Sequence, residues 1–140
     1  MCSEGFESIV NVDYSEKVIE MMADRTRETY PSMKWIPADF RNMRAQLSNS
    51  SFDVVLDKGS LDALWSDGGS QWDPSDQVLS DINAALDEVL RVLRPHGGKF
   101  ISITFGQPHF RLPHMNREQD WKLVASDKLG LYYIYIFEKF

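Results

Sequence analysis

Cysteine is nearly absent from this chain of 140 residues, in which Cys2 is the only one. A single cysteine excludes an internal disulfide and a cysteine-built zinc site, and it fits a reducing compartment. Apolar runs are short, and none approaches the roughly 18 residues that cross a bilayer. The first residues also lack the basic and apolar segments of a secretory signal. We therefore expect neither a membrane span nor secretion.

Positive charge is also scarce, because 15 Lys and Arg face 21 Asp and Glu, for a formal net charge of −6. This balance argues against non-specific binding to nucleic acid, which needs clustered cations opposite phosphates. Hydrophobic residues nevertheless make up 43% of the chain, including 8 Phe, 5 Tyr and 4 Trp. That is ample material for a core, so a disordered chain is excluded and one domain over residues 1–140 is predicted.

Short apolar stretches alternate with amphipathic ones along the chain. The pattern predicts strands at 8–13, 33–37, 52–57 and 99–104. It also predicts a helix capped by Ser15 and a longer one that begins at Asp73-Pro74 and ends before Pro95. The segments 121–125 and 132–137 are too close for a helical crossover, so they predict an antiparallel hairpin. The stretch 59–72 reads as irregular, with a loop at 67–70. The fold class is therefore an open α/β sheet with helices on its faces.

Acidic residues follow three of the predicted strands, namely Asp13, Asp39 and Asp57. Ligands of open α/β sheets bind at the carboxyl ends of the parallel strands, where a carboxylate accepts hydrogen bonds from ribose hydroxyls. A row of carboxylates repels phosphates, which favours an adenosine-like ligand without a phosphate chain. Aspartate is also common in turns and at helix starts, so each acid alone has a purely structural interpretation.

Several segments together resemble the motifs of class I S-adenosylmethionine-dependent methyltransferases. They are Asn11–Ser15, Ala38–Phe40, Phe52–Ala63 and Leu90–Ile101. The stretch from Asp57 to Ala63 resembles the branch that contains the lysine methyltransferases of elongation factor 1-alpha and of citrate synthase. Pro108–Arg111 resembles the elongation-factor members in particular. The resemblance implies a Rossmann-like methyltransferase sheet, S-adenosylmethionine as cofactor and lysine in a protein, such as a translation elongation factor, as methyl acceptor.

The resemblance also implies roles for individual residues. Asp13 would hold the ribose with Tyr14 beside the adenosine, and Asp39 and Phe40 would frame the adenine. Asp57, Lys58 and Gly59 would border the methionine end of the cofactor. Residues on the acceptor side would be Leu61, Asp62, Trp65, His109 and Arg111. Methyl transfer to an amine needs alignment more than a general base, so no catalytic residue is assigned.

The first strand of that family and its glycine-rich loop have no counterpart, since Gly5 is the only glycine before Asp13. The missing strand is central and would lie between the strands at 9–13 and 52–57. Three outcomes are open: the flanking strands pair directly, a partner supplies a strand, or the chain is an amino-terminally truncated domain. We favour truncation. The default location is cytoplasmic, and a mitochondrial one stays open because a missing amino terminus would carry the targeting segment.

Two other functional classes compete with a methyltransferase. The missing glycine loop favours a non-catalytic remnant or interaction module that keeps the fold without the cofactor. A nicotinamide-dependent oxidoreductase shares the ribose acid, but it needs a glycine-rich pyrophosphate loop and is ranked last. His109 and His114 are five residues apart in a segment broken by Pro113, so no metal site is predicted.

Overall fold

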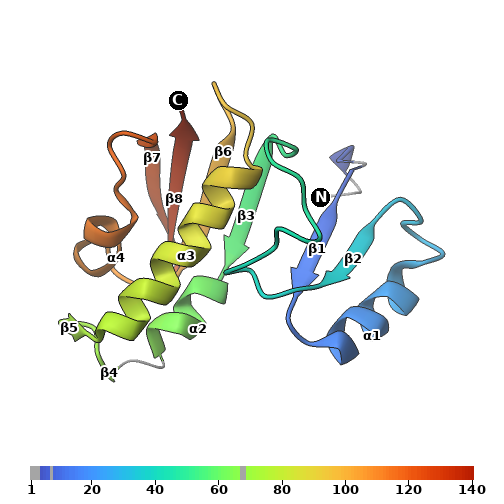
Figure 1. The fold of residues 1–140 in the computed structure, drawn as a ribbon, viewed down its shortest axis with the longest axis horizontal. Coiled ribbons are helices and arrows are strands. Elements are labelled where there is room, and N and C mark those ends of the chain that lie inside the picture. Colours follow the sequence, from blue (N-terminus) through green and yellow to red (C-terminus); the bar gives the residue numbers. More distant parts are fainter. Residues whose placement is uncertain (1–3, 7, 67–68) are drawn as a thin grey trace. The chain divides into compact units, whose positions relative to one another are not determined.

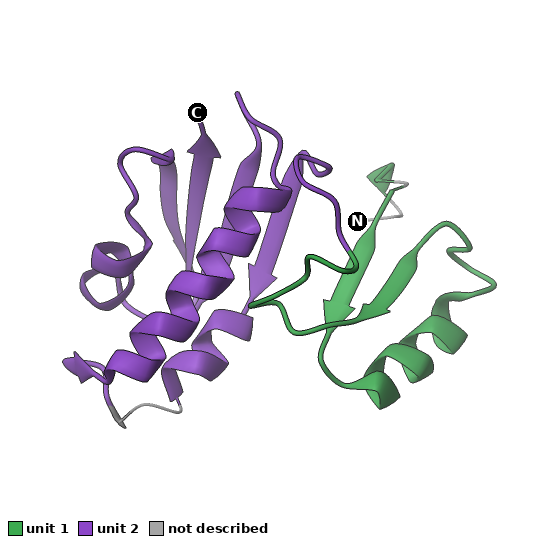
Figure 2. Cartoon of the chain, in the orientation of Figure 1, with its two compact units in different colours: residues 1–46 green, residues 47–140 purple. Residues whose placement is uncertain are grey.

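The computed structural model describes residues 4–6, 8–66 and 69–140, which form parts of two compact units (Figure 2). Unit 1 covers residues 1–46 and unit 2 covers residues 47–140. In the described ranges, no helix is both long and apolar enough to pass through a membrane. The prediction of a single domain remains a prediction.

The described part of unit 1 contains two parallel strands and one helix. Strand β1 (Val10–Asp13) pairs with β2 (Lys34–Pro37), so that Asp13 lies opposite Pro37. Helix α1 (Glu16–Thr26) connects them, and its predicted cap is confirmed because the hydroxyl of Ser15 accepts the N–H of Val18 at 3.3 Å. Both strands therefore end at the same edge, where Asp13 is the last residue of β1 and Asp39 follows β2 by two residues.

Unit 2 is built on a four-stranded sheet in the order β3-β6-β8-β7 (Figure 1). Its strands are β3 (Val54–Lys58), β6 (Lys99–Thr104), β7 (Trp121–Leu129) and β8 (Tyr132–Lys139). Strands β3 and β6 are parallel, whereas β7 and β8 form the antiparallel hairpin that the sequence predicts. A further pair of two-residue strands, β4 (Gly69–Ser70) and β5 (Asp73–Pro74), is antiparallel.

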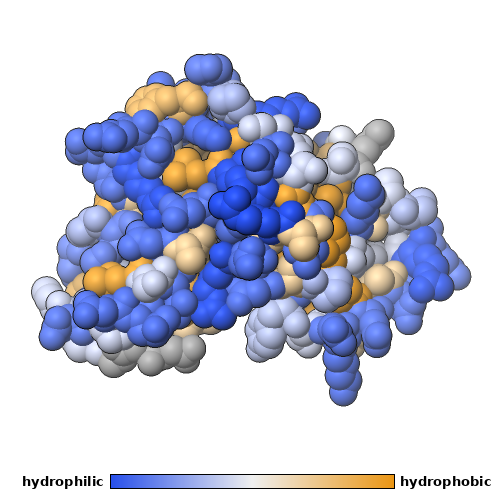
Figure 3. Space-filling view, viewed as in Figure 1, coloured by the Kyte–Doolittle hydropathy of each residue, from blue (hydrophilic) through white to orange (hydrophobic). Residues whose placement is uncertain are grey.

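Outside residues 67 and 68, which the structure does not describe, unit 2 has three helices: α2 (Ser60–Ser66), α3 (Asp76–Val92) and α4 (Pro108–Met115). The buried stripe of α3 recurs at three- and four-residue steps, as predicted. It contributes to a core whose largest fully buried side chains include Ile82, Leu86, Phe100, Trp121 and Phe137. The alternate residues of β3 remain exposed, with Val54 at 42% and Leu56 at 43%, so one face of the sheet has less cover than the other. Hydrophobic residues also reach the surface in separate patches in Figure 3.

Each sheet pairs strands of a single unit. In the described ranges, β1 pairs with β2 in unit 1, and β3 pairs with β6 in unit 2. The three outcomes for the missing central strand therefore stay predictions.

Three local predictions need correction. The stretch 59–72 is not irregular throughout, because it contains α2 and the strand β4, whose partner β5 follows directly after the stretch. The long helix is capped by Ser75, whose hydroxyl accepts the N–H of Val78 at 3.3 Å, and not by Asp73. Pro113 lies inside α4 instead of breaking the segment. Of the loop predicted at 67–70, residues 67 and 68 lie outside the described ranges.

Candidate functional site

Asp13 ends β1 and keeps one carboxylate oxygen available. Its Oδ1 accepts the backbone N–H of Ser15 at 2.8 Å, which fixes the side chain at the start of α1. Its Oδ2 has no partner among the described residues, and the residue is only partly buried. The neighbouring Tyr14 is 82% exposed. A half-buried carboxylate with a free oxygen is suited to accept hydrogen bonds from ligand hydroxyls.

Asp39 lies just beyond β2 and is held by Arg41. The guanidinium donates to both carboxylate oxygens, with Nη2 at 2.7 Å from Oδ2 and Nε at 3.0 Å from Oδ1. These hydrogen bonds hold the pKa of Asp39 below its ordinary value, so the group is anionic near neutrality. Phe40, which follows, is partly buried. Asp39 is therefore less available to a ligand than Asp13.

Asp57 is a buried acid of unit 2, with 8% of its surface exposed, and lies near the end of β3. Its Oδ1 accepts the N–H of Ser60 at 2.9 Å and that of Leu61 at 3.3 Å, so it caps α2. Its Oδ2 accepts the hydroxyl of Ser102 at 3.3 Å. Burial raises the pKa of Asp57 despite these bonds, because the charged form loses hydration.

Lys58 and Gly59 complete the turn from β3 into α2. Gly59 has φ of 82°, a left-handed conformation that disfavours other residues, and its N–H donates to Ile103 at 3.1 Å. The Lys58 side chain is exposed, and its ammonium lies 5.9 Å from the ring centre of Tyr132. This turn places a cation and an unhindered backbone at the carboxyl edge of the unit 2 sheet.

Three residues expected on the acceptor side form one cluster. Arg111 of α4 is 4% exposed, and its Nη2 lies 3.2 Å from Oδ1 of Asp62 on α2. Its guanidinium also lies over the ring of Trp65, with 4.6 Å between the Cζ atom and the ring centre. A cavity of about 230 Å³ adjoins this cluster, lined by Asp62, Trp65, Ser66, Gln71, Phe105, Gly106 and Arg111.

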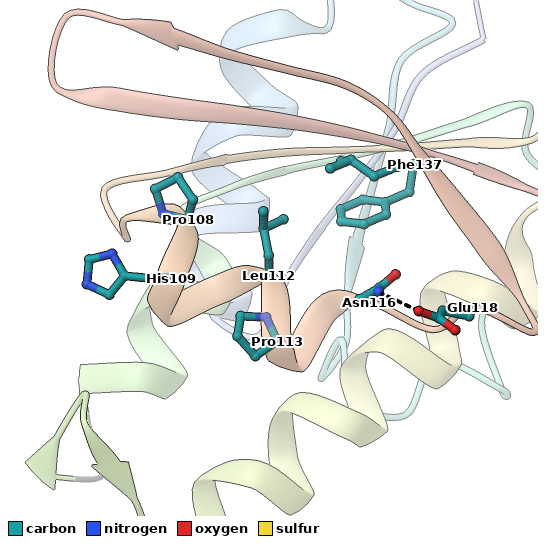
Figure 4. Close-up of a pocket in the computed structure, with 8 residues that line it drawn as sticks. Pro108, His109, Leu112, Pro113, Asn116, Glu118 and Phe137 are labelled. Carbon is teal, nitrogen blue, oxygen red and sulfur yellow. Dashed lines mark hydrogen bonds between the residues drawn. The ribbon is translucent and has the colours of Figure 1, made fainter.

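His109 does not join that cluster. It is exposed on α4 and packs with Phe110 and Trp72, whose ring centre lies 5.7 Å away. It borders a separate groove of about 590 Å³ between α4 and the hairpin, and its ring points away from Leu112 and Phe137 (Figure 4). Within the described ranges, no three His, Cys, Asp or Glu residues gather in a way that would hold a metal ion.

Comparison with known families decides the class of this domain. A family model described as "Methyltransferase domain" matches residues 3–138, which is nearly the whole chain. The chain belongs to the methyltransferase domain family. The resemblance inferred from the strand-end motifs is thereby confirmed, and so is the α/β methyltransferase fold.

Two curated relatives share clear sequence similarity with this methyltransferase domain. The first, EEF1A lysine methyltransferase 4 from Mus musculus, is 39% identical over 120 residues, covering 85% of this chain and 46% of the relative. The second, eEF1A lysine and N-terminal methyltransferase from Bos taurus, is 36% identical over 117 residues, covering 81% of this chain and 16% of the relative. The chain thus spans less than half the length of either relative.

A solved structure shares the fold at low sequence identity. The PH0226 protein from Pyrococcus horikoshii aligns with a TM-score of 0.69 and 19% identity, covering 99% of this chain and 74% of that one. Identity this low supports the fold alone.

Residues that the sequence motifs did not single out also build the acceptor-side cluster of this methyltransferase domain. Thr104 donates its hydroxyl to Oδ1 of Asp62 at 2.5 Å, and the N–H of Phe105 donates to Oδ2 at 3.0 Å. Gly106 lies against Arg111, since a Cβ atom there would stand 2.2 Å from the Arg111 Nε. Thr104 is the last residue of β6, and Phe105 and Gly106 follow it. Their position at the carboxyl end of a parallel strand was the one feature of the sequence that could have indicated a role in a site.

Proposed function

We propose that this chain acts as an S-adenosylmethionine-dependent protein-lysine methyltransferase. The observation that supports this most strongly is the 39% identity over 120 residues to a protein named EEF1A lysine methyltransferase 4. By the same comparison, the proposed methyl acceptor is a lysine of a translation elongation factor. S-adenosylmethionine, when bound, supplies an electrophilic methyl group on a sulfonium.

In unit 1, the residues present fit the adenosine part of this cofactor. The free Oδ2 of Asp13 is proposed to accept hydrogen bonds from the ribose hydroxyls. Tyr14 offers an exposed ring beside the nucleoside, and Phe40 offers an apolar contact for adenine. The carboxylate of Asp39 already binds Arg41, so Asp39 is a weaker candidate than Asp13 for hydrogen bonds to the nucleoside.

In unit 2, the turn Asp57–Gly59 is proposed to border the methionine part of the cofactor. The acceptor side is proposed to be the cluster of Asp62, Trp65 and Arg111, which opens at the same end of the parallel strands. A lysine arrives as an ammonium and must release a proton before its nitrogen takes the methyl group. Alignment of the amine supplies most of the acceleration, and no general base is assigned.

The first test is calorimetric titration of S-adenosylhomocysteine into the purified chain. Asp13→Ala is expected to weaken binding about tenfold or more, because hydrogen bonds to a charged group are lost. Asp24→Ala is the matched control, since Asp24 is an exposed acid paired with Arg27 on the surface of α1. Radiolabelled methyl transfer to purified elongation factor 1-alpha, with its lysines mapped by mass spectrometry, then tests the acceptor.

A non-catalytic module is the second candidate. It is favoured by the lack of any glycine between Gly5 and Gly59. A chain that shows a cooperative unfolding transition but no heat of binding with S-adenosylhomocysteine would support this candidate and contradict methyl transfer. Equal binding by the wild type and Asp13→Ala would contradict the proposed ribose site.

A further inference from the structure

The acceptor-side cavity of unit 2 contains a hydrogen-bond donor without a partner. Arg111 donates to Asp62 from Nε at 3.3 Å and from Nη2 at 3.2 Å, but its Nη1 is buried and bonds to nothing among the described residues. Buried polar atoms are nearly always satisfied, and an exception calls for an explanation. Nη1 carries two protons and belongs to a residue that lines the cavity, so an oxygen atom in the cavity is a suitable acceptor for it.

The orientation of this guanidinium is fixed on several sides. Asp62 accepts hydrogen bonds from Nε and Nη2, and the Trp65 ring lies against the plane of the guanidinium. Gly106 lies so close to Nε and Cζ that there is no room for a Cβ atom between them. Asp62 is itself held by Thr104 and by the N–H of Phe105. Nη1 therefore remains in place without a ligand, and such preorganised donors bind with little loss of conformational entropy.

The charge of the cavity selects the type of hydrogen-bond acceptor that Nη1 can bind. The cation of Arg111 is balanced by the carboxylate of Asp62, so the charges of the described lining residues cancel and do not attract a second anion. Asp62 would also repel a carboxylate or phosphate placed beside it. A neutral oxygen avoids this repulsion, and a peptide carbonyl is a strong neutral acceptor.

The shape and lining of the cavity fit a short stretch of polypeptide. Its volume is about 230 Å³, and its walls include Trp65, Gly106 and Phe105, which is 58% exposed. Aromatic rings offer flat apolar surfaces against which an extended backbone can lie. The cavity also lies beyond β6, whose residue Ile103 pairs with Lys58 next to the Asp57–Gly59 turn.

We propose that Nη1 of Arg111 donates a hydrogen bond to a backbone carbonyl of the polypeptide that is methylated. Arg111 would thus position the chain next to the acceptor lysine, with Trp65 and Phe105 beside it. This inference rests on the proposed function, because it assigns part of the protein substrate to this cavity.

The direct test is made on the wild-type chain, and a variant serves only to assign the signals. The side-chain N–H signals of Arg111 are followed by NMR with isotope-labelled arginine, and Arg111→Lys provides the assignment. The probe is a lysine-containing tripeptide blocked by acetyl and amide groups, with sodium acetate and inorganic phosphate as anion probes. The peptide is expected to shift the Nη1 signals saturably and at lower concentration than either anion. No shift with peptide, or a response to acetate or phosphate at lower concentration, would overturn the proposal.

A second measurement separates this inference from the proposed function. Arg111→Lys keeps a cation for Asp62 but removes Nη1, so the KM for the elongation factor is expected to rise about tenfold to a hundredfold. The affinity for S-adenosylhomocysteine should stay unchanged. Arg91→Lys is the matched control, because Arg91 forms a similarly buried pair with Glu88 but does not line the cavity. An unchanged KM in Arg111→Lys would overturn this inference alone, whereas absent cofactor binding in the wild type would overturn the proposed function.

Discussion

Nη2 of Arg111 lies 3.2 Å from Oδ1 of Asp62, and this ion pair connects α4 to α2. Both side chains are largely buried, with 5% of Arg111 and 17% of Asp62 exposed. Helix α2 has seven residues and is too short to be stable by itself. Its position therefore depends on tertiary contacts such as this pair and the bonds that Asp62 accepts from the end of β6.

Asp62→Asn is expected to destabilise the fold by about 3 kcal/mol, because it leaves the buried Arg111 cation without its counter-charge. Asparagine keeps the size of the side chain and can still accept the N–H of Phe105. Urea unfolding of the variant and the wild type measures the difference.

The matched control for that prediction is Asp53→Asn. Asp53 also pairs with an arginine, Arg94, but 75% of its side chain and 55% of that of Arg94 are exposed. Exposed pairs contribute about 1 kcal/mol or less, so this variant should unfold almost like the wild type. Equal losses in the two variants would contradict the structural role assigned to the Asp62–Arg111 pair.

Asp57→Asn is expected to stabilise the chain at neutral pH. Burial raises the pKa of Asp57, so the folded chain binds this proton more tightly than the unfolded chain. The contribution of Asp57 to stability is therefore greatest in acid and falls as the pH rises from about 4 through the raised pKa. Asparagine never acquires the buried charge, and its oxygen can still accept the N–H groups of Ser60 and Leu61.

Urea unfolding at a series of pH values checks this sign. The stability gained by Asp57→Asn should grow from about pH 4 towards pH 7. Calorimetry on the same variant should show weaker binding of S-adenosylhomocysteine, since Asp57 belongs to the proposed cofactor turn. If the stability of Asp57→Asn relative to the wild type instead falls as the pH rises, Asp57 is needed in its charged form.

Ser75→Ala is expected to cost about 1 kcal/mol, because the Ser75 hydroxyl accepts the N–H of Val78 in the first turn of α3. Asp73→Ala tests the alternative cap that the sequence suggests, and it should change stability by less than about half of that amount. Thermal unfolding of both variants compares the two positions. A larger effect at Asp73 would contradict the observed start of α3.

The sequence predicted most strands and the long helix because apolar periodicity records which face of an element is buried. The stripe of α3 and the alternation in β8 both depend on local spacing, and both are found in the structure. Helix α2 was missed although Leu61 and Trp65 stand four residues apart, because one turn of pattern is a weak signal. Its cap comes from Asp57 at the end of the preceding strand, which only the folded turn reveals.

The candidate site was predictable only in part. The resemblance named Asp62, Trp65 and Arg111, and the structure brings these three together, but it leaves His109 on a different surface of α4. The free Nη1 of Arg111 and its contact with Gly106 depend on how α4 folds against the end of β6. No local sequence pattern reports such a tertiary contact.

Gly106→Ala is expected to displace the Arg111 guanidinium, because the new Cβ atom would stand 2.2 Å from Nε and 2.4 Å from Cζ. Overpacking of this kind costs about 1–3 kcal/mol in a close-packed interior. The cost should fall when Arg111 is shortened to alanine, since Nε, Cζ and Cγ of Arg111 are the three atoms nearest to the new Cβ. A double-mutant cycle of Gly106→Ala and Arg111→Ala, measured by urea unfolding, should therefore give a coupling of about 1 kcal/mol or more. Additive losses would mean that Gly106 is required for its own backbone geometry and that the position of Arg111 does not depend on it.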